Sequence, residues 1–228
     1  GIGGSRGLMV NATDPAAPHD IVYGAVRKGG IRTYVEATGT ENKFLHMILV
    51  LAGHELEAID DIYLDDEIAT VDASGFVTSG DWNSKVRIKK HRGNETVADS
   101  LLLSESNQIT ANFVGNGIAY LYIRLEYDQD AFANGVPLIT AKVRGRKVYD
   151  PRSASTAYTA NAALVVRDYI TAGFGLADSA VDDLAFAASA NVSDEAIALD
   201  GGGTEPRYEI NGVVSSDMSP RTIVSRMM

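Results

Sequence analysis

The chain of 228 residues has no cysteine. This absence excludes disulfide bridges, thiolate metal sites and cysteine nucleophiles, and it leaves the redox environment of the protein open. Positive charge is also scarce, because 20 Lys and Arg residues stand against 30 Asp and Glu residues, giving a formal net charge of −10. An acidic surface repels phosphate groups, so we do not expect the chain to wrap or specifically bind nucleic acid.

Long apolar stretches are missing as well. The longest, residues 44–52, includes His46 and is too short to span a bilayer, and no signal peptide is recognisable, so we expect no membrane insertion by this chain. The chain begins with Gly1 rather than Met and stops soon after Ser219-Pro220, a pair typical of a helix start. These ends lead us to expect an internal fragment of a longer protein.

Residues 118–152 carry the clearest strand patterns. Apolar and polar residues alternate over 119–128, which predicts a strand with one buried face and with Tyr120 and Tyr122 on the other, polar face. A second predicted strand, residues 138–148, is interrupted at Gly145 by a bulge or a close backbone approach. Because residues 134–137 (NGVP) predict a turn, we expect these two strands to form a two-stranded frame.

Further strands are predicted before this frame. Residues 21–26 and 31–35 flank residues 27–30 (RKGG), a hairpin pattern. The apolar run 44–52 predicts a buried strand, and residues 59–68 predict a strand with a tight turn at Asp65-Asp66. The basic strand 86–91 is the one local positive patch, and we expect it to pair with a neighbouring acidic surface.

The pattern becomes helical after residue 152. Residues 160–171 predict a helix ended by Gly173 and Gly175, with a buried stripe at Ala162, Val166, Tyr169 and Ile170. Residues 179–182 (SAVD) fit a capping box for a second helix, with a buried stripe at Val181, Leu184, Ala185 and Ala188. A shorter helical piece is predicted over 193–199, and a strand or hairpin over 207–214.

Together these patterns predict an α+β fold: a β-rich domain of hairpins in a barrel-like or sandwich-like arrangement, followed by a small helical α+β segment. We expect a flexible arm at 1–18, the β-rich region at 19–150 with a possible inserted β subdomain at about 55–115, and a helix-rich segment at 151–228 that is truncated at its C-terminal end.

Metal and cofactor sites are not expected. His46 and His54 flank a strand without HExxH spacing, so a core and a loop histidine are favoured over a metal pair. The acidic residues of the 59–68 segment lack EF-hand spacing, and a solvated hairpin tip is favoured over a calcium site. They are Asp60, Asp61, Asp65, Asp66 and Glu67. The glycine-rich start, residues 1–7, has no flanking strand and helix for dinucleotide binding.

Catalytic residues are not expected either. The carboxylate pairs Asp60/Asp61 and Asp182/Asp183 are adjacent in sequence and so do not predict two groups facing across a cleft. Three serines lie near glycines, Ser5, Ser74 and Ser79, but none is in a G-x-S-x-G motif. We therefore predict no enzyme activity.

A host-adhesion or carbohydrate-binding module is the alternative from a different functional class. It would need exposed aromatic side chains, and the candidates are Tyr120 and Tyr122, since Trp82 is the one tryptophan. Packing of the two tyrosines against a neighbouring domain or subunit is the favoured interpretation.

The order of several segments resembles the tail tip attachment protein (J protein) family of lambda-type long-tailed phages. The segments that carry the resemblance are residues 22–24 (VYG), 43–55 (KFLHMILVLAGHE), 134–137 (NGVP), 145–152 (GRKVYDPR), 161–164 (NAAL), 167–169 (RDY) and 202–208 (GGTEPRY). They run over nearly the whole chain in the family's order.

The resemblance implies a virion protein of the distal tail tip, assembled in the host cytoplasm, that takes part in host attachment and genome delivery. It implies a homotrimer that closes the tail tube and contacts the distal tail protein, the tape measure protein and other tail-tip proteins. DNA would pass through its channel without specific binding, and we expect part of the negative charge to line that channel. The family offers no catalytic residues, cofactor or metal to carry over.

Overall fold

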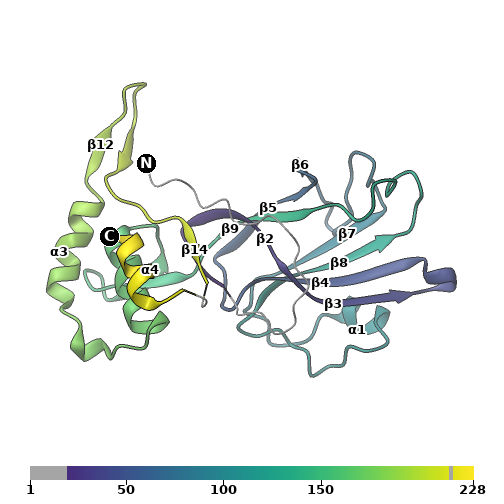
Figure 1. Cartoon of the computed structure of the whole chain (residues 1–228), viewed down its shortest axis with the longest axis horizontal. Helices are drawn as coiled ribbons and strands as arrows, with labels where there is room; N and C mark the ends of the chain where they lie inside the picture. The colour runs from purple at the N-terminus through teal and green to yellow at the C-terminus, as the bar shows by residue number, and fades with distance from the viewer. Residues whose placement is uncertain (1–19, 216–217) are drawn as a thin grey trace. The chain divides into compact units, whose positions relative to one another are not determined.

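A computed structural model describes residues 20–215 and 218–228 (Figure 1). It confirms the α+β class, with several antiparallel sheets and a few short helices. The described chain forms two compact units: unit 1 is residues 27–143, and unit 2 combines residues 20–26 with residues 144–228, apart from 216 and 217. No helix in these described ranges is long and apolar enough to cross a membrane. The predicted arm at 1–18 lies outside the described residues.

The first sheet of unit 1 is antiparallel, with its strands in the order β3-β4-β8-β7. These strands are β3 (Ile31–Thr38), β4 (Phe44–Ala52), β8 (Ala119–Glu126) and β7 (Val86–His91). The apolar run 44–52 is the buried strand that the sequence predicts, and it lies between β3 and β8. A short 3-10 turn, Thr40–Asn42, joins β3 to β4.

The second sheet of unit 1 has the order β2-β9-β5-β6, with strands β2 (Ala25–Gly29), β9 (Ile139–Arg144), β5 (Ala58–Leu64) and β6 (Glu67–Ile68). Asp65 and Asp66 form the predicted tight turn between β5 and β6, with φ of 45° and 72°. Two positive φ values are typical of a two-residue hairpin turn. The two sheets touch where Lys90 of β7 donates to the carbonyl of Ile59 on β5 at 3.0 Å.

Two predicted strand pairings are wrong. β8 and β9 were expected to form a frame, and the strands around residues 27–30 were expected to form a hairpin, but in each case the two strands belong to different sheets. Gly30 lies where the chain changes sheets, and a Cβ there would come within 2.7 Å of the Val50 carbonyl oxygen. The chain does turn near residues 27–30 and 134–137, but each turn connects strands of two different sheets.

The prediction that β8 buries one face is also wrong, because both faces are buried. Tyr120 and Tyr122 are 0% and 1% exposed. They pack with Ile48 and Val50 beneath α1 (Ser100–Glu105) and the loop that follows it. The alternation over residues 119–128 would also place Tyr127 on the buried face, but Tyr127 is exposed because the strand ends at Glu126.

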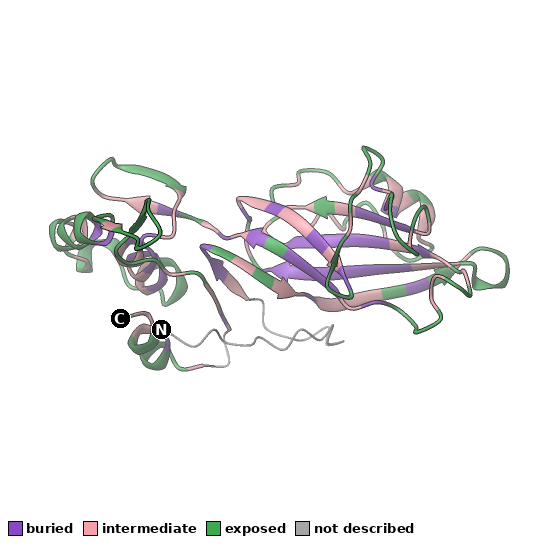
Figure 2. Cartoon of the chain, turned by 90° about the horizontal axis from the view of Figure 1, so that it is seen from above, coloured by how far each residue is buried: buried purple, intermediate pink, exposed green. Residues whose placement is uncertain are grey.

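Unit 2 consists of three two-stranded sheets and short helices. The strand pairs are β1 (Ile21–Tyr23) with β14 (Gly212–Val214), β10 (Lys147–Asp150) with β11 (Ser155–Tyr158), and β12 (Ala196–Ala198) with β13 (Thr204–Pro206). The helices are α2 (Ala162–Asp168), which continues as a π-turn over Tyr169–Gly173, the 3-10 turn Asp178–Ala180, α3 (Asp183–Ser193) and α4 (Pro220–Met227). Figure 2 shows how few residues of α3 and of the β12–β13 hairpin are buried.

Several predictions for unit 2 need correction. Asp182, and not Ser179, is the N-cap of α3, because its side chain accepts hydrogen bonds from the amides of Leu184 and Ala185. The predicted stripe of α3 is wrong, since Leu184, Ala185 and Ala188 are exposed while Ala190 and Ser193 are buried. Residues 193–199 contain strand β12 and not a helix. Ser219 does cap α4 as the sequence predicts.

The buried face of α2 is broader than its predicted stripe. Tyr169 is buried as expected, but Leu164, Val165, Arg167 and Asp168 are buried instead of Ala162 and Val166. The reason is that α2 contacts β10, α3 and α4, so it packs on several sides. The helical segment ends near Gly175, which has a φ of +89°.

Candidate functional site

A carboxylate on α2 joins three distant segments of unit 2. Tyr23 of β1 donates its hydroxyl to Asp168 Oδ2 at 2.6 Å, and Arg146 Nε lies 3.2 Å from the same oxygen. Burial raises the pKa of Asp168 above its usual range, although Tyr23, Arg146 and Arg167 act in the opposite direction. Burial and the nearby carboxylate also raise the pKa of Tyr23, which keeps its hydroxyl protonated as a donor.

A second carboxylate, at the end of α3, has its own group of polar contacts in unit 2. Arg152 Nη1 donates to Asp194 Oδ2 at 2.8 Å, and its Nη2 donates to Asp150 Oδ2 at 2.8 Å. Asn161, the N-cap of α2, donates its Nδ2 to Asp194 Oδ1 at 2.8 Å and to the carbonyl of Ala190 at 2.9 Å. The hydrogen bond from Arg152 lowers the pKa of Asp150.

Arg167 ties the start of α3 to α2. Its Nε donates to Asp183 at 2.8 Å, and its guanidinium carbon lies 4.8 Å from the centre of the Tyr149 ring. The hydrogen bond to Asp183 raises the pKa of the buried Arg167 guanidinium. We call the polar contacts of Tyr23, Arg146, Asp150, Arg152, Asn161, Arg167, Asp168 and Asp194 the unit 2 network.

Two glycines allow the backbone to pack tightly beside this network. The Gly145 amide donates to the Gly24 carbonyl at 2.7 Å, and a Cβ at Gly145 would lie 2.2 Å from the Val22 carbonyl oxygen. Gly24 has a φ of +61°. The close backbone approach predicted at Gly145 is therefore confirmed, and a side chain there requires the β1 backbone to move.

Unit 1 has its own buried polar cluster, centred on Glu105 at the end of α1. Arg87 of β7 forms a two-pronged ion pair with Glu105, Arg124 Nη1 lies 3.3 Å from Glu105 Oε1, and Tyr122 donates its hydroxyl to Oε2 at 2.6 Å. Burial alone raises the pKa of a carboxyl group, but the bonds from Arg87 and Tyr122 and the charges of Arg87 and Arg124 together lower that of Glu105.

His46 extends this cluster by two further hydrogen bonds. Its Nδ1 lies 2.8 Å from the Tyr122 hydroxyl and its Nε2 lies 2.7 Å from Thr38 Oγ1. Since Tyr122 gives its proton to Glu105, His46 Nδ1 must donate and Nε2 must accept. Burial lowers the pKa of His46 and favours this neutral form. His46 is the satisfied core histidine that the sequence favours.

The other sequence candidates lie apart from one another. His54 Nδ1 lies 2.7 Å from the Glu55 carbonyl oxygen. The acidic hairpin tip is bound to distant segments of unit 1, since Asp65 Oδ1 accepts from the Leu138 amide at 2.7 Å and Asp66 pairs with Arg27 of β2. Within residues 20–215 and 218–228, no three His, Asp or Glu side chains gather in a way that could hold a metal ion.

The hydrolase candidates do not face each other across a cleft. Asp60 and Asp61 are consecutive residues of β5, while Asp182 caps α3 and Asp183 binds Arg167. The Ser74 amide donates to Asp72 within a turn, Ser79 is in an exposed loop, and Ser5 lies outside the described residues. The burial of Tyr120 and Tyr122 also removes the two best carbohydrate-binding candidates.

The sequence does not predict that Glu105 and Asp168 lie at the centres of the two networks. A partial signal exists for Glu105, because the basic strand 86–91 was expected to meet acidic groups. Arg87 does bind Glu105, and His91 lies 3.0 Å from Asp99. Asp168 lies in the segment 167–169 that carries the family resemblance, but no spacing pattern predicts its contacts with Tyr23 and Arg146.

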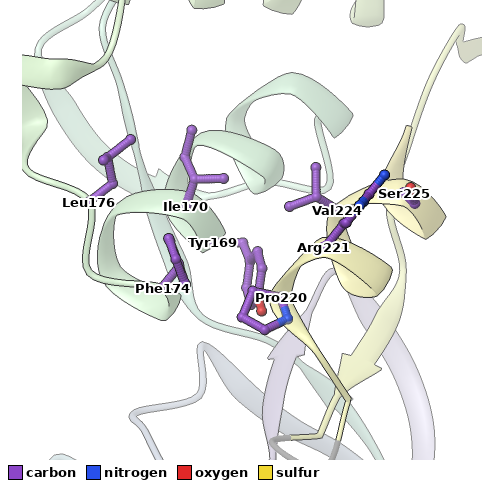
Figure 3. A pocket seen from close by; sticks show the side chains of 8 residues that line it. All are labelled: Tyr169, Ile170, Phe174, Leu176, Pro220, Arg221, Val224 and Ser225. Carbon is purple, nitrogen blue, oxygen red and sulfur yellow. The ribbon is translucent and has the colours of Figure 1, made fainter.

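An apolar groove, drawn in Figure 3, lies in unit 2 between the π-turn after α2 and helix α4. Its volume is about 440 Å³. Its lining residues are Tyr169, Ile170, Phe174, Leu176, Pro220, Arg221, Val224 and Ser225. The rim residues Phe174 and Leu176 are 60% and 40% exposed. Sequence patterns missed this groove because its two walls are about fifty residues apart in the chain.

Comparisons with known proteins identify no family for the chain. No family model matches it, and no curated protein matches it. A chain in a solved structure titled "Virion of native gene transfer agent (GTA) particle" is similar, with 17% sequence identity and a TM-score of 0.45. The match covers 63% of this chain and 30% of that one, so this chain spans less than a third of the length of its structural relative. This likeness is too low to assign the fold or the function of this chain.

Proposed function

We propose that this chain is a structural protein of a phage virion, part of the homotrimeric tail-tip hub that closes the distal end of a long-tailed phage tail tube. In this role it takes part in host attachment and genome delivery. The observation that supports the proposal is the spatial convergence of the resembling segments. Residues 22–24, 145–152, 161–164 and 167–169 are dispersed in sequence, yet they supply the unit 2 network.

Each of these segments contributes a contact that fixes the fold. Tyr23 and Arg146 meet at Asp168, Asn161 caps α2, and Gly145 packs on the β1 backbone. These contacts form three groups, around Asp168, Asp194 and Arg167, and all three lie within unit 2. The convergence supports a shared module and not a series of accidental matches.

The chemistry of the networks also suits an assembly role. In both networks the charged groups are engaged with one another, as Glu105 is with Arg87 and Arg124. Such pairs fix a fold in one conformation, whereas a catalytic site needs reactive groups that face a substrate.

The charge of the whole chain fits a channel for DNA. At −10, it gives the chain little attraction for phosphate, and a channel that passes DNA without specific binding needs weak phosphate contacts. The proposed neighbours are the distal tail protein, the tape measure protein and other tail-tip proteins.

Quantitative mass spectrometry of purified phage particles tests the proposal. We expect peptides of this chain in particles purified away from lysate, at a small fixed copy number close to three per particle. The matched control is a major capsid peptide, whose copy number calibrates the scale. Absence of the chain from pure particles, or a copy number comparable to that of the capsid protein, would contradict the hub assignment.

A further inference from the structure

Helix α3 leaves an apolar stripe without a cover in unit 2. Leu184, Ala188 and Val192 recur every four residues and so lie along one side of the helix. All three are exposed: Leu184 is 86% exposed and Val192 is 44% exposed. We call this set the α3 stripe. Single exposed apolar residues are common on protein surfaces, but an aligned set on one helix face is typical of a contact surface.

The same unit contains a concave surface of matching chemistry. The groove between the π-turn and α4 is lined mainly by carbon-rich side chains, and Figure 3 shows Phe174 and Leu176 on one wall and Pro220 and Val224 on the other. An amphipathic helix laid into such a groove, with anchors every three or four residues, is a common mode of protein recognition. The α3 stripe has this anchor spacing.

The charges beside the two surfaces are complementary. Helix α4 carries Arg221 and Arg226 and no acidic residue, and Arg221 lines the groove. Helix α3 carries no basic residue, and the exposed Asp182 immediately precedes it. Asp182 is thus an exposed acidic group two residues before Leu184, and Arg221 is a basic group on the groove wall. This complementarity favours a second copy of the chain as the occupant.

We infer that the α3 stripe of one copy docks into the groove of a second copy of this chain. Because stripe and groove are different surfaces, the contact is heterologous, and repeated contacts of this kind close into a ring when the rotation between copies allows it. The inference rests on the proposed homotrimer and specifies the surfaces through which its subunits join.

Sedimentation equilibrium of the 228-residue chain tests this inference with two variants at exposed positions. Leu184→Asp disables the stripe and Phe174→Asp disables the groove. We expect each variant to self-associate at least about 30-fold more weakly than the wild type, as for an interface anchor. Val97→Asp in unit 1 is the matched control, since Val97 is also exposed and apolar, and it should associate like the wild type.

Mixing the two variants gives the sharper result. Leu184→Asp retains a groove and Phe174→Asp retains a stripe, so an equimolar mixture should recover pairs but not closed rings. Recovery also shows that both variants are folded. Self-association that persists in both variants, or a wild-type chain that stays monomeric, would overturn the docking inference. Either result leaves the virion proposal to its own test, because the copy number in purified particles does not depend on which surfaces join.

Discussion

At the scale of single residues, the stability of the structure depends on a few positions. At these positions a small substitution would displace the backbone or leave a buried charge without its partner. Gly145 is such a position because its neighbour is the backbone of β1 and not a flexible side chain. Glu105 is another such position, because its carboxylate accepts hydrogen bonds from two arginines and a tyrosine. Both lead to predictions about stability.

Gly145→Ala should destabilise unit 2 by about 1–3 kcal/mol, since the new methyl group must displace the Val22 carbonyl. Faster hydrogen exchange at the amides of β1 and β14 measures this loss. Gly201→Ala is the matched control, because a Cβ at Gly201 meets no atom within 4 Å, and it should change exchange little. Equal hydrogen-exchange rates in the two variants would show that the close approach at Gly145 does not contribute to the stability of unit 2.

Glu105→Gln should lower the free energy of unfolding of unit 1 by about 3 kcal/mol at pH 7, because it leaves the buried Arg87 without its carboxylate. The single tryptophan, Trp82, belongs to unit 1, so its fluorescence during urea denaturation reports this change. Glu67→Gln, at an exposed position of β6, is the control.

The same residue predicts a dependence on pH. The pKa of Glu105 is lower in the folded chain than its usual value near 4.3, so its stabilising contribution is complete above that pH and is lost as the pH falls through the folded pKa. His46, whose pKa burial lowers, disfavours acid conditions in the same direction. We expect stability to decline as the pH falls below about 6.5, because of His46, and below about pH 5 to decline more steeply in the wild type than in Glu105→Gln. Parallel pH profiles would contradict this account.

At the scale of helices and strands, side-chain caps link elements as well as ending them. Asn161 accepts from the Leu164 amide as the cap of α2, and it also holds the last turn of α3 through Ala190 and Asp194. Asp182, by comparison, only caps α3 in the contacts described for it.

Asn161→Ala should therefore cost more than Asp182→Ala. We expect about 2–3 kcal/mol for Asn161→Ala, from the lost cap and two lost hydrogen bonds, against about 1 kcal/mol for Asp182→Ala. Thermal unfolding followed by circular dichroism ranks the two variants. If Asp182→Ala were the more damaging, the link between α2 and α3 would have to lie elsewhere.

Local sequence patterns predicted individual strands, turns and helix caps better than they predicted which strands pair. The strand 44–52, the turn at Asp65-Asp66 and the Ser219 cap were all predicted, because each depends on neighbours in the sequence. The pairing of β8 with β9 was not, because a strand's partner is chosen by burial across the sheet and not by its nearest turn. The prediction that Leu184 is buried failed for a related reason. An apolar stripe on a helix predicts a contact, and no such contact covers α3 within the described residues.

The centres of the two networks show the same limit. Asp168 bonds to Tyr23 and approaches Arg146, but no spacing rule in the sequence predicts these contacts, since one partner lies on β1 and the other lies between β9 and β10. Tyr122 was identified as notable but was placed on an exposed face, because alternation does not reveal that α1 covers it.

At the scale of the whole molecule, we propose that this chain belongs to the tip of a phage tail. The claim rests on the convergence of dispersed motifs in unit 2, and the net charge of −10 agrees with a channel that releases DNA. A measured channel with a strongly basic wall would contradict the part of the claim that concerns DNA passage.

The most direct test of the central claim is immunogold labelling of intact virions, with antibody raised against this chain, viewed by negative-stain electron microscopy. Detergent-stripped particles with opened tips serve as a second sample, because assembly can hide the epitopes. We predict gold at the distal end of the tail in at least one of the two samples. Gold along lateral fibres, or no particle labelling in either sample, would contradict the account.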